Sequence, residues 1–138
     1  MEVHCKTAHK NSSNLPKFSF LMIQVPTQSL TDQWVTVCPI AQILPNTGVC
    51  ALVKGQQVAV FRVGDGTEVY ALSNYDPFSK AFVLSRGIIG DRNGIPKVAS
   101  PIYKQNFNLQ TGQCLDDETV SVPTFAVRVI EMQVQVSV

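Results

Sequence analysis

Short runs of β-branched and aromatic residues, separated by turn residues, dominate the chain from Trp34 to its end. Runs of this kind, rich in Val, Ile, Phe and Tyr, are typical of β-strands. They predict strands at residues 34–37, 49–54, 57–63, 69–73, 95–99, 107–109, 125–131 and 133–138. Several short strands at close intervals indicate an antiparallel all-β barrel or sandwich.

Glycine-containing turns predict which of these strands pair as hairpins. Lys54-Gly55 and Asn93-Gly94 are two-residue connections, and Gly64-Asp65-Gly66 links the third predicted strand to the fourth. Such turns need positive φ angles, which glycine and asparagine adopt more readily than other residues. Only residues 77–85 have a spacing compatible with a short helix, so the fold is expected to contain at most one.

The first 31 residues differ from the rest because they are mostly polar and show no periodicity. We expect residues 1–31 to form a disordered N-terminal extension and residues 32–138 to form a single domain. The apolar run Phe18–Val25 is much shorter than the roughly 18 residues that span a membrane. No small-residue cleavage site follows it, so neither secretion nor membrane association is expected.

Composition and charge narrow the possible partners. Hydrophobic residues make up 45% of the chain, enough for one packed core. Eleven Lys and Arg residues against ten Asp and Glu residues give a net charge of +1. No strongly basic face can be built from this balance, so nucleic acid is not an expected partner.

The positions of histidine and cysteine restrict the chemistry further. His4 and His9 are the two histidines, so the predicted domain has no imidazole for a catalytic base, a triad or a metal. The four cysteines form no Cys-x-x-Cys pair. We therefore expect them to be small buried side chains with free thiols in a reducing compartment.

Two segments of the predicted domain carry a larger pattern. Residues 74–78 read Asn-Tyr-Asp-Pro-Phe, and residues 100–109 read Ser-Pro-Ile-Tyr-Lys-Gln-Asn-Phe-Asn-Leu, followed by Thr111-Gly112. This resembles the Rieske iron–sulfur domain, whose two loops read Asn-x-Cys-Pro-His and Cys-Pro-x-His-Gly-x-x-Phe-x-Leu. The resemblance implies a Rieske-like barrel or sandwich with a small loop subdomain at about residues 74–106.

The four ligand positions of the Rieske pattern hold other residues here. Asp76 and Phe78 replace the first cysteine and histidine, and Ser100 and Tyr103 replace the second pair. A Rieske cluster needs two thiolates and two imidazoles, and a phenyl ring cannot bind iron. We expect no iron in this chain. We also expect the rings of Phe78 and Tyr103 to fill the cluster's space, with centroids within about 7 Å of each other.

A more specific resemblance comes from four runs that extend over most of the domain: Leu44–Leu52, Asp76–Phe78, Val83–Gly87 and Val98–Pro101. They are similar to the small subunit of bacterial NAD(P)H-dependent nitrite reductase, a Rieske-like family without the cluster ligands. The resemblance implies a cytoplasmic accessory subunit with no catalytic residue, metal or cofactor of its own. Its partner would be a large subunit that carries FAD, an iron–sulfur cluster and sirohaem and reduces nitrite to ammonium in nitrate and nitrite assimilation.

The resemblance also places a contact surface at the tip where the two loops would meet. Its expected residues combine aromatic side chains with lysines, a composition that suits an interface centre and its polar rim. They are Tyr75, Asp76, Phe78, Lys80, Ser100, Tyr103 and Lys104. The alternative is a free-standing β-domain that binds another protein or a small molecule.

Overall fold

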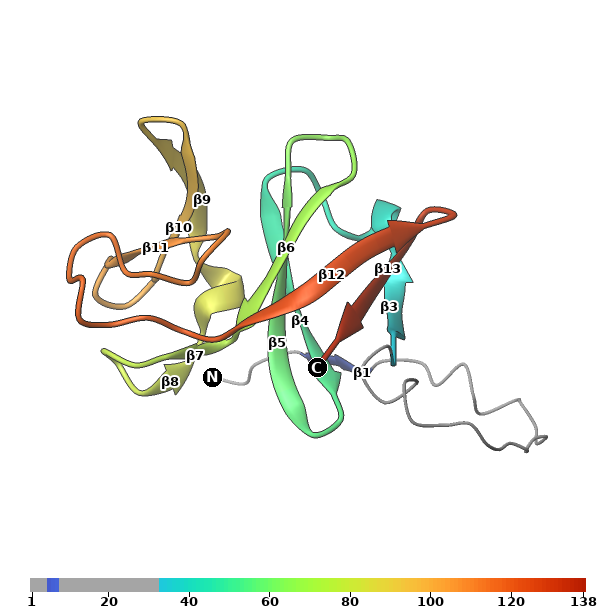
Figure 1. Cartoon of the computed structure of the whole chain (residues 1–138), viewed down its shortest axis with the longest axis horizontal. Helices are drawn as coiled ribbons and strands as arrows, with labels where there is room; N and C mark the ends of the chain where they lie inside the picture. The colour runs from blue at the N-terminus through green and yellow to red at the C-terminus, as the bar shows by residue number, and fades with distance from the viewer. Residues whose placement is uncertain (1–4, 8–32) are drawn as a thin grey trace.

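The computed structural model describes residues 5–7 and 33–138, and its largest element is a seven-stranded sheet that nearly closes into a barrel (Figure 1). The strand order in this sheet is β1-β4-β5-β6-β12-β13-β3. In that order the strands are Cys5–Thr7, Thr47–Val53, Gln56–Val63, Glu68–Ser73, Thr124–Ile130, Gln133–Ser137 and Val35–Pro39. Every pair is antiparallel except β1 with β4, which is parallel.

Two smaller sheets lie on one side of the large sheet, at the left of Figure 1. One has the order β11-β10-β9, with β9 at Ile88–Arg92, β10 at Ile95–Ala99 and β11 at Asn106–Asn108. The other is the hairpin of β7 (Tyr75–Asp76) and β8 (Ala81–Phe82). Two short 3-10 helices, η3 (Ile40–Gln42) and η4 (Leu84–Arg86), complete the described elements.

Two hydrophobic clusters hold these parts together. The first packs Ile40 of η3 and Ile43, which follows it, against residues of the large sheet such as Val60. The second packs Phe61 of the large sheet against Phe107 of the small one, with seven other buried residues. Because the second cluster spans both sheets, it fixes the position of the loops that the small sheets carry.

The eight predicted strands are confirmed, with ends shifted by two residues or fewer. The Asn93-Gly94 turn is also confirmed, since both residues have positive φ angles of 54° and 86° between β9 and β10. Strand β9 was not predicted. Residues 77–85, whose spacing is compatible with a short helix, contain a turn, β8 and the start of the 3-10 helix η4.

The expected disordered extension, residues 1–31, lies outside the described residues except for Cys5–Thr7, which form β1. The prediction for the cysteines is correct in part. Cys38 and Cys114 are buried and neither forms a disulfide, but Cys50 is disulfide-bonded. Within the described part of the chain, no helix is long and apolar enough to cross a membrane.

Candidate functional site

The two segments that resemble Rieske loops lie side by side at one end of the molecule. Asp76 ends β7 and Phe78 follows it in the turn to β8, while Ser100 and Tyr103 lie in the turn after β10. The Ser100 hydroxyl donates a hydrogen bond of 2.5 Å to Oδ2 of Asp76. Two of the four ligand-equivalent positions are therefore in direct contact, one from each loop.

The Asp76 carboxyl group is the centre of this contact. It is fully buried, and its Oδ2 also accepts a 2.8 Å hydrogen bond from the Ser79 hydroxyl. Its Oδ1 accepts a 2.9 Å hydrogen bond from the backbone N–H of Phe78. Three donors thus satisfy a group that would be costly to bury without partners. Ser79 was not among the predicted site residues, and nothing in the sequence pattern distinguishes it from other loop serines.

Ser100 organises the second loop as well as contacting the first. Its backbone N–H donates to the carbonyl of Gln105 at 2.9 Å, and its carbonyl accepts from the N–H of Lys104 at 3.1 Å. Its Oγ accepts from the N–H of Ile102 at 3.4 Å. The second loop is consequently a closed turn around Ser100 that presents its outer residues to solvent.

Asn74, which precedes the first loop, is a second buried polar residue that the predicted site did not include. Its Oδ1 accepts a 2.7 Å hydrogen bond from the N–H of Ser85, and its Nδ2 donates to Oε1 of Gln57 at 3.0 Å. These contacts join η4, β5 and the start of the first loop. The asparagine of the Rieske-like pattern was the signal that could have identified it.

The aromatic residues of the two loops do not pair as predicted. Phe78 packs against Phe107, with ring centroids 6.1 Å apart, rather than against Tyr103. Tyr103 is 61% exposed at the surface of the second loop. Phe107 belongs to the buried cluster shared by the two sheets, so Phe78 gains more apolar burial there than it would beside an exposed ring.

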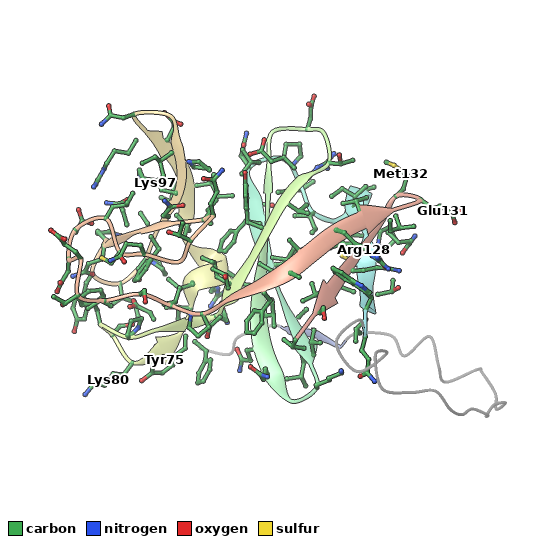
Figure 2. All side chains as sticks on the ribbon, viewed as in Figure 1. Tyr75, Lys80, Lys97, Arg128, Glu131 and Met132 are labelled. Atoms are coloured by element: carbon green, nitrogen blue, oxygen red, sulfur yellow. The ribbon has the colours of Figure 1, made fainter. Side chains whose placement is uncertain are left out.

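The outer surface of the two loops, which we call the tip, carries cations and aromatic or aliphatic side chains. Lys80 and Lys104 are exposed, and Ile102 is 45% exposed beside Tyr103. Tyr75 packs edge-to-face against Phe82, with centroids 5.1 Å apart. Figure 2 shows Tyr75 and Lys80 at the opposite end of the molecule from Arg128 and Glu131.

Asp116 supports the second loop from outside. Its Oδ2 accepts hydrogen bonds from the backbone N–H and the side-chain amide of Asn106, at 2.8 and 3.0 Å. Arg92 lies 3.3 Å from its Oδ1. The backbone hydrogen bond from Asn106, followed by the side-chain contacts, lowers the pKa of Asp116 below its usual value.

The residues at the ligand positions do not fit a Rieske [2Fe–2S] cluster. Such a cluster takes thiolate and imidazole ligands. Asp76 and Ser100 are instead hydrogen-bonded to each other. The phenyl ring of Phe78 has no atom that could coordinate iron, and it packs against Phe107. Among residues 5–7 and 33–138, no group of three or more His, Cys, Asp or Glu side chains is placed to hold a metal ion. The arrangement connects the two loops by a buried hydrogen bond.

Comparison with known proteins identifies the fold and the relatives of the chain. A family model for the Rieske-like [2Fe-2S] domain matches residues 33–137. The NADH nitrite reductase small subunit of Salmonella typhimurium is 50% identical over 104 residues, which cover 75% of this chain and 96% of the relative. The NAD(P)H nitrite reductase large subunit of Klebsiella oxytoca is 42% identical over 96 residues, 70% of this chain but only 10% of that protein.

A solved structure agrees with these matches. The solution structure of the nitrite reductase [NAD(P)H] small subunit from Erwinia carotovora is 50% identical and superposes with a TM-score of 0.67. The match covers 76% of this chain and 81% of that structure. With a matching family model and relatives at this identity and coverage, the chain belongs to the family of NADH nitrite reductase small subunits, which have a Rieske-like fold.

Proposed function

We propose that this chain is a cytoplasmic accessory subunit that docks onto the large subunit of NAD(P)H nitrite reductase and carries no cluster of its own. The enzyme would reduce nitrite to ammonium in nitrate and nitrite assimilation. The observation that carries the proposal is the Asp76–Ser100 hydrogen bond, which occupies the position where both loops would bind a cluster. A chain that keeps the frame of an electron carrier without its ligands fits a role in assembly better than a role in redox chemistry.

The Klebsiella relative supports the choice of partner. In that protein a domain 42% identical to this chain is one tenth of a large subunit. A domain that is covalently part of the enzyme in one relative is expected to bind the same enzyme when it is a separate chain. On this view the FAD, the iron–sulfur cluster and the sirohaem all belong to the large subunit.

The tip is the proposed docking surface. Tyr103, Lys80 and Lys104 are exposed there and available to a partner, while Asp76 and Ser100 are buried beneath them. The buried pair would act on docking indirectly, by fixing the shape of the two loops. Aromatic side chains bordered by cations match the usual composition of an interface centre and rim, and favour a partner surface with acidic groups.

Co-purification with the large subunit tests this proposal. We expect Lys80→Glu and Lys104→Glu, combined, to weaken the association at least tenfold at low salt while leaving the melting temperature unchanged. Lys54→Glu is a matched control, because Lys54 is also an exposed lysine with a positive φ but lies in the β4–β5 turn. Equal binding by the wild type and the tip variant would place the interface elsewhere, and no association at all would favour a free-standing binding module.

Iron content tests the second part of the proposal. The purified chain should be colourless and contain no stoichiometric iron, even when expressed with iron–sulfur assembly proteins and excess iron. About two irons per chain with the absorption of a [2Fe–2S] cluster would overturn it. The matched positive control is a Rieske ferredoxin expressed in the same cells.

A further inference from the structure

Strand β9 forms one edge of the small three-stranded sheet. The strand order of this sheet is β11-β10-β9, so among the described residues β9 pairs with β10 alone. The opposite edge differs, because β11 continues its pairing through the bridge between Phe107 and Cys114. No residue of β9 is buried. The sheet therefore has one open edge, and an open edge is a template for a further strand.

The hydrogen bonds of β10 determine which way the backbone groups of β9 point. The carbonyl of Pro96 accepts a 2.9 Å hydrogen bond from the N–H of Leu109, so the backbone of Pro96 faces β11. Successive residues of a strand face alternate neighbours, and Lys97 therefore faces β9. The register partner of Lys97 is Gly90. Gly90 consequently directs its own N–H and C=O groups toward β10.

The two residues beside Gly90 face the other way. Ile89 and Asp91 direct their N–H and C=O groups toward the open edge, because neighbours in a strand alternate. Among residues 5–7 and 33–138, β9 has no strand on that side. The edge therefore presents two donors and two acceptors to an incoming strand. Ile89 holds the edge in place, since its side chain packs against the second hydrophobic cluster.

The open edge of β9 is continuous with the tip. Ile88, at the start of β9, is the register partner of Ala99, which directly precedes Ser100 of the second loop. Its side chain is 72% exposed. Figure 2 shows Lys97 on the same side of the molecule as Lys80. A partner that covers the tip thus has the edge of β9 beside it.

The cations beside Gly90 indicate the chemistry of a strand that would fit. A Cβ at Gly90 would lie 3.3 Å from Nζ of Lys97, so the ammonium group lies directly over this glycine. The same Nζ donates to Oδ1 of Asn106 at 2.7 Å and has two further hydrogens to donate. Arg92, on the same face of β9, carries a second cation and pairs with Asp116. An acidic side chain opposite Gly90 would therefore meet Lys97.

We propose that the open edge of β9 is a strand-addition site, which takes an extended acidic and apolar segment of the nitrite reductase large subunit. This inference rests on the proposed function, because it names a second part of the same docking surface. Main-chain hydrogen bonds to Ile89 and Asp91 supply affinity in this mode of binding. An apolar side chain opposite Ile88 and an acidic one opposite Gly90 supply specificity.

A proline at position 91 tests the edge without interrupting the pairing of β9 with β10. Proline has no N–H, and the N–H of Asp91 faces the open edge, so Asp91→Pro removes a donor to the incoming strand. Asp91→Ala is the matched control, because it also loses the carboxylate that accepts from the N–H of Gly94 but keeps the backbone donor. We expect the affinity for the large subunit to be about tenfold lower in Asp91→Pro than in Asp91→Ala. Lys97→Met should weaken binding and lower its dependence on salt.

Amide hydrogen exchange of the wild-type chain gives a second readout that needs no variant. In the free chain the amides of Ile89 and Asp91 should exchange faster than the amide of Gly90, which is bonded to β10. Binding of the large subunit should slow both. Unchanged exchange of Ile89 and Asp91 in the complex would overturn the proposal, whatever the variants show.

The two docking proposals can fail separately. Weaker binding in the combined Lys80→Glu and Lys104→Glu variant, without slower exchange at β9, would keep the tip as the interface and remove the edge. Slower exchange at β9 with normal binding by that variant would do the reverse. A wild-type chain that dimerises, when Asp91→Pro does not, would assign the edge to a second copy and overturn the choice of partner.

Discussion

Replacing Ser100 with alanine tests whether the buried hydrogen bond to Asp76 holds the two loops together. The variant removes the 2.5 Å donor to Asp76 Oδ2 and the acceptor for the N–H of Ile102. Ser100 is fully buried, so water cannot easily replace the lost hydroxyl. A hydrogen bond to a carboxylate contributes about 1.5–3 kcal/mol, and that is the expected loss in the free energy of unfolding.

Urea unfolding at pH 7, followed by circular dichroism, measures this loss directly. At about 4 °C per kcal/mol for a domain of this size, the melting temperature should fall by roughly 6–12 °C. Ser79→Ala removes the other hydroxyl donor to the same oxygen, but Ser79 is half-buried and water can compensate. It should cost less, about 0.5–1.5 kcal/mol.

A double-mutant cycle separates the hydrogen bond from other effects of the substitutions. Asp76→Ala combined with Ser100→Ala should show a coupling energy of about 1–3 kcal/mol, because the two side chains are in contact. Asp76→Asn should be milder than Asp76→Ala, since an amide can donate to hydroxyls that are free to rotate. A loss below about 0.5 kcal/mol for Ser100→Ala, the range of neutral surface changes, would refute the reasoning.

Three further predictions concern the packing and electrostatics around the loops. Gly87→Ala should destabilise the fold by about 1–3 kcal/mol in urea unfolding, because its Cβ would lie 2.3 Å from the carbonyl oxygen of Ala99. Phe78→Ala should cost about 1–3 kcal/mol by the same assay, and Phe78→Leu clearly less, because leucine keeps most of the burial against Phe107. The lowered pKa of Asp116 contributes stability that is present above the unfolded-state value of about 3.9 and is lost as the pH falls through the lower folded-state value. In Asp116→Asn the free energy of unfolding should therefore fall less steeply as the pH drops below about 4. The same fall in the variant as in the wild type would contradict this assignment.

The strands could be predicted because their signals are local. Asn93-Gly94 adopts the positive φ angles of a two-residue hairpin, and the alternating burial of β12 follows its sequence directly. Strand β9 could not be predicted, because Gly90 and Asp91 are residues that rarely occur in strands. Its pairing with β10 comes from tertiary contacts. The segment after Asp76 forms a turn, although its spacing is compatible with a helix, because the Asp76 side chain accepts a hydrogen bond from the N–H of Phe78.

The sequence could predict which segments lie together at the site, but not which side chains contact each other there. Resemblance to a two-loop frame placed Asp76 and Ser100 at a common tip, and they are indeed bonded. The ring against which Phe78 packs is determined by where buried apolar surface lies in the fold. That surface is provided by Phe107, a residue whose depth no local pattern reveals. Ser79 was missed for the same reason, since its role follows from its distance to a carboxylate.

Under the proposed function, the Asp76–Ser100 contact is what lets a Rieske-like frame persist without a cluster. In a Rieske domain the metal centre bonds to both loops and so cross-links them. Here one buried carboxyl group accepts hydrogen bonds from both loops, through Ser100 on one side and through Phe78 and Ser79 on the other. A cross-link of hydrogen bonds is weaker than metal coordination but needs no cofactor assembly. It keeps the outer residues of the tip in fixed positions, which is the property that a docking surface requires and an electron carrier shares. On this reasoning, loss of the ligands removes electron transfer from the tip while leaving its shape intact, and Ser100→Ala should weaken docking to the large subunit even though its hydroxyl is buried.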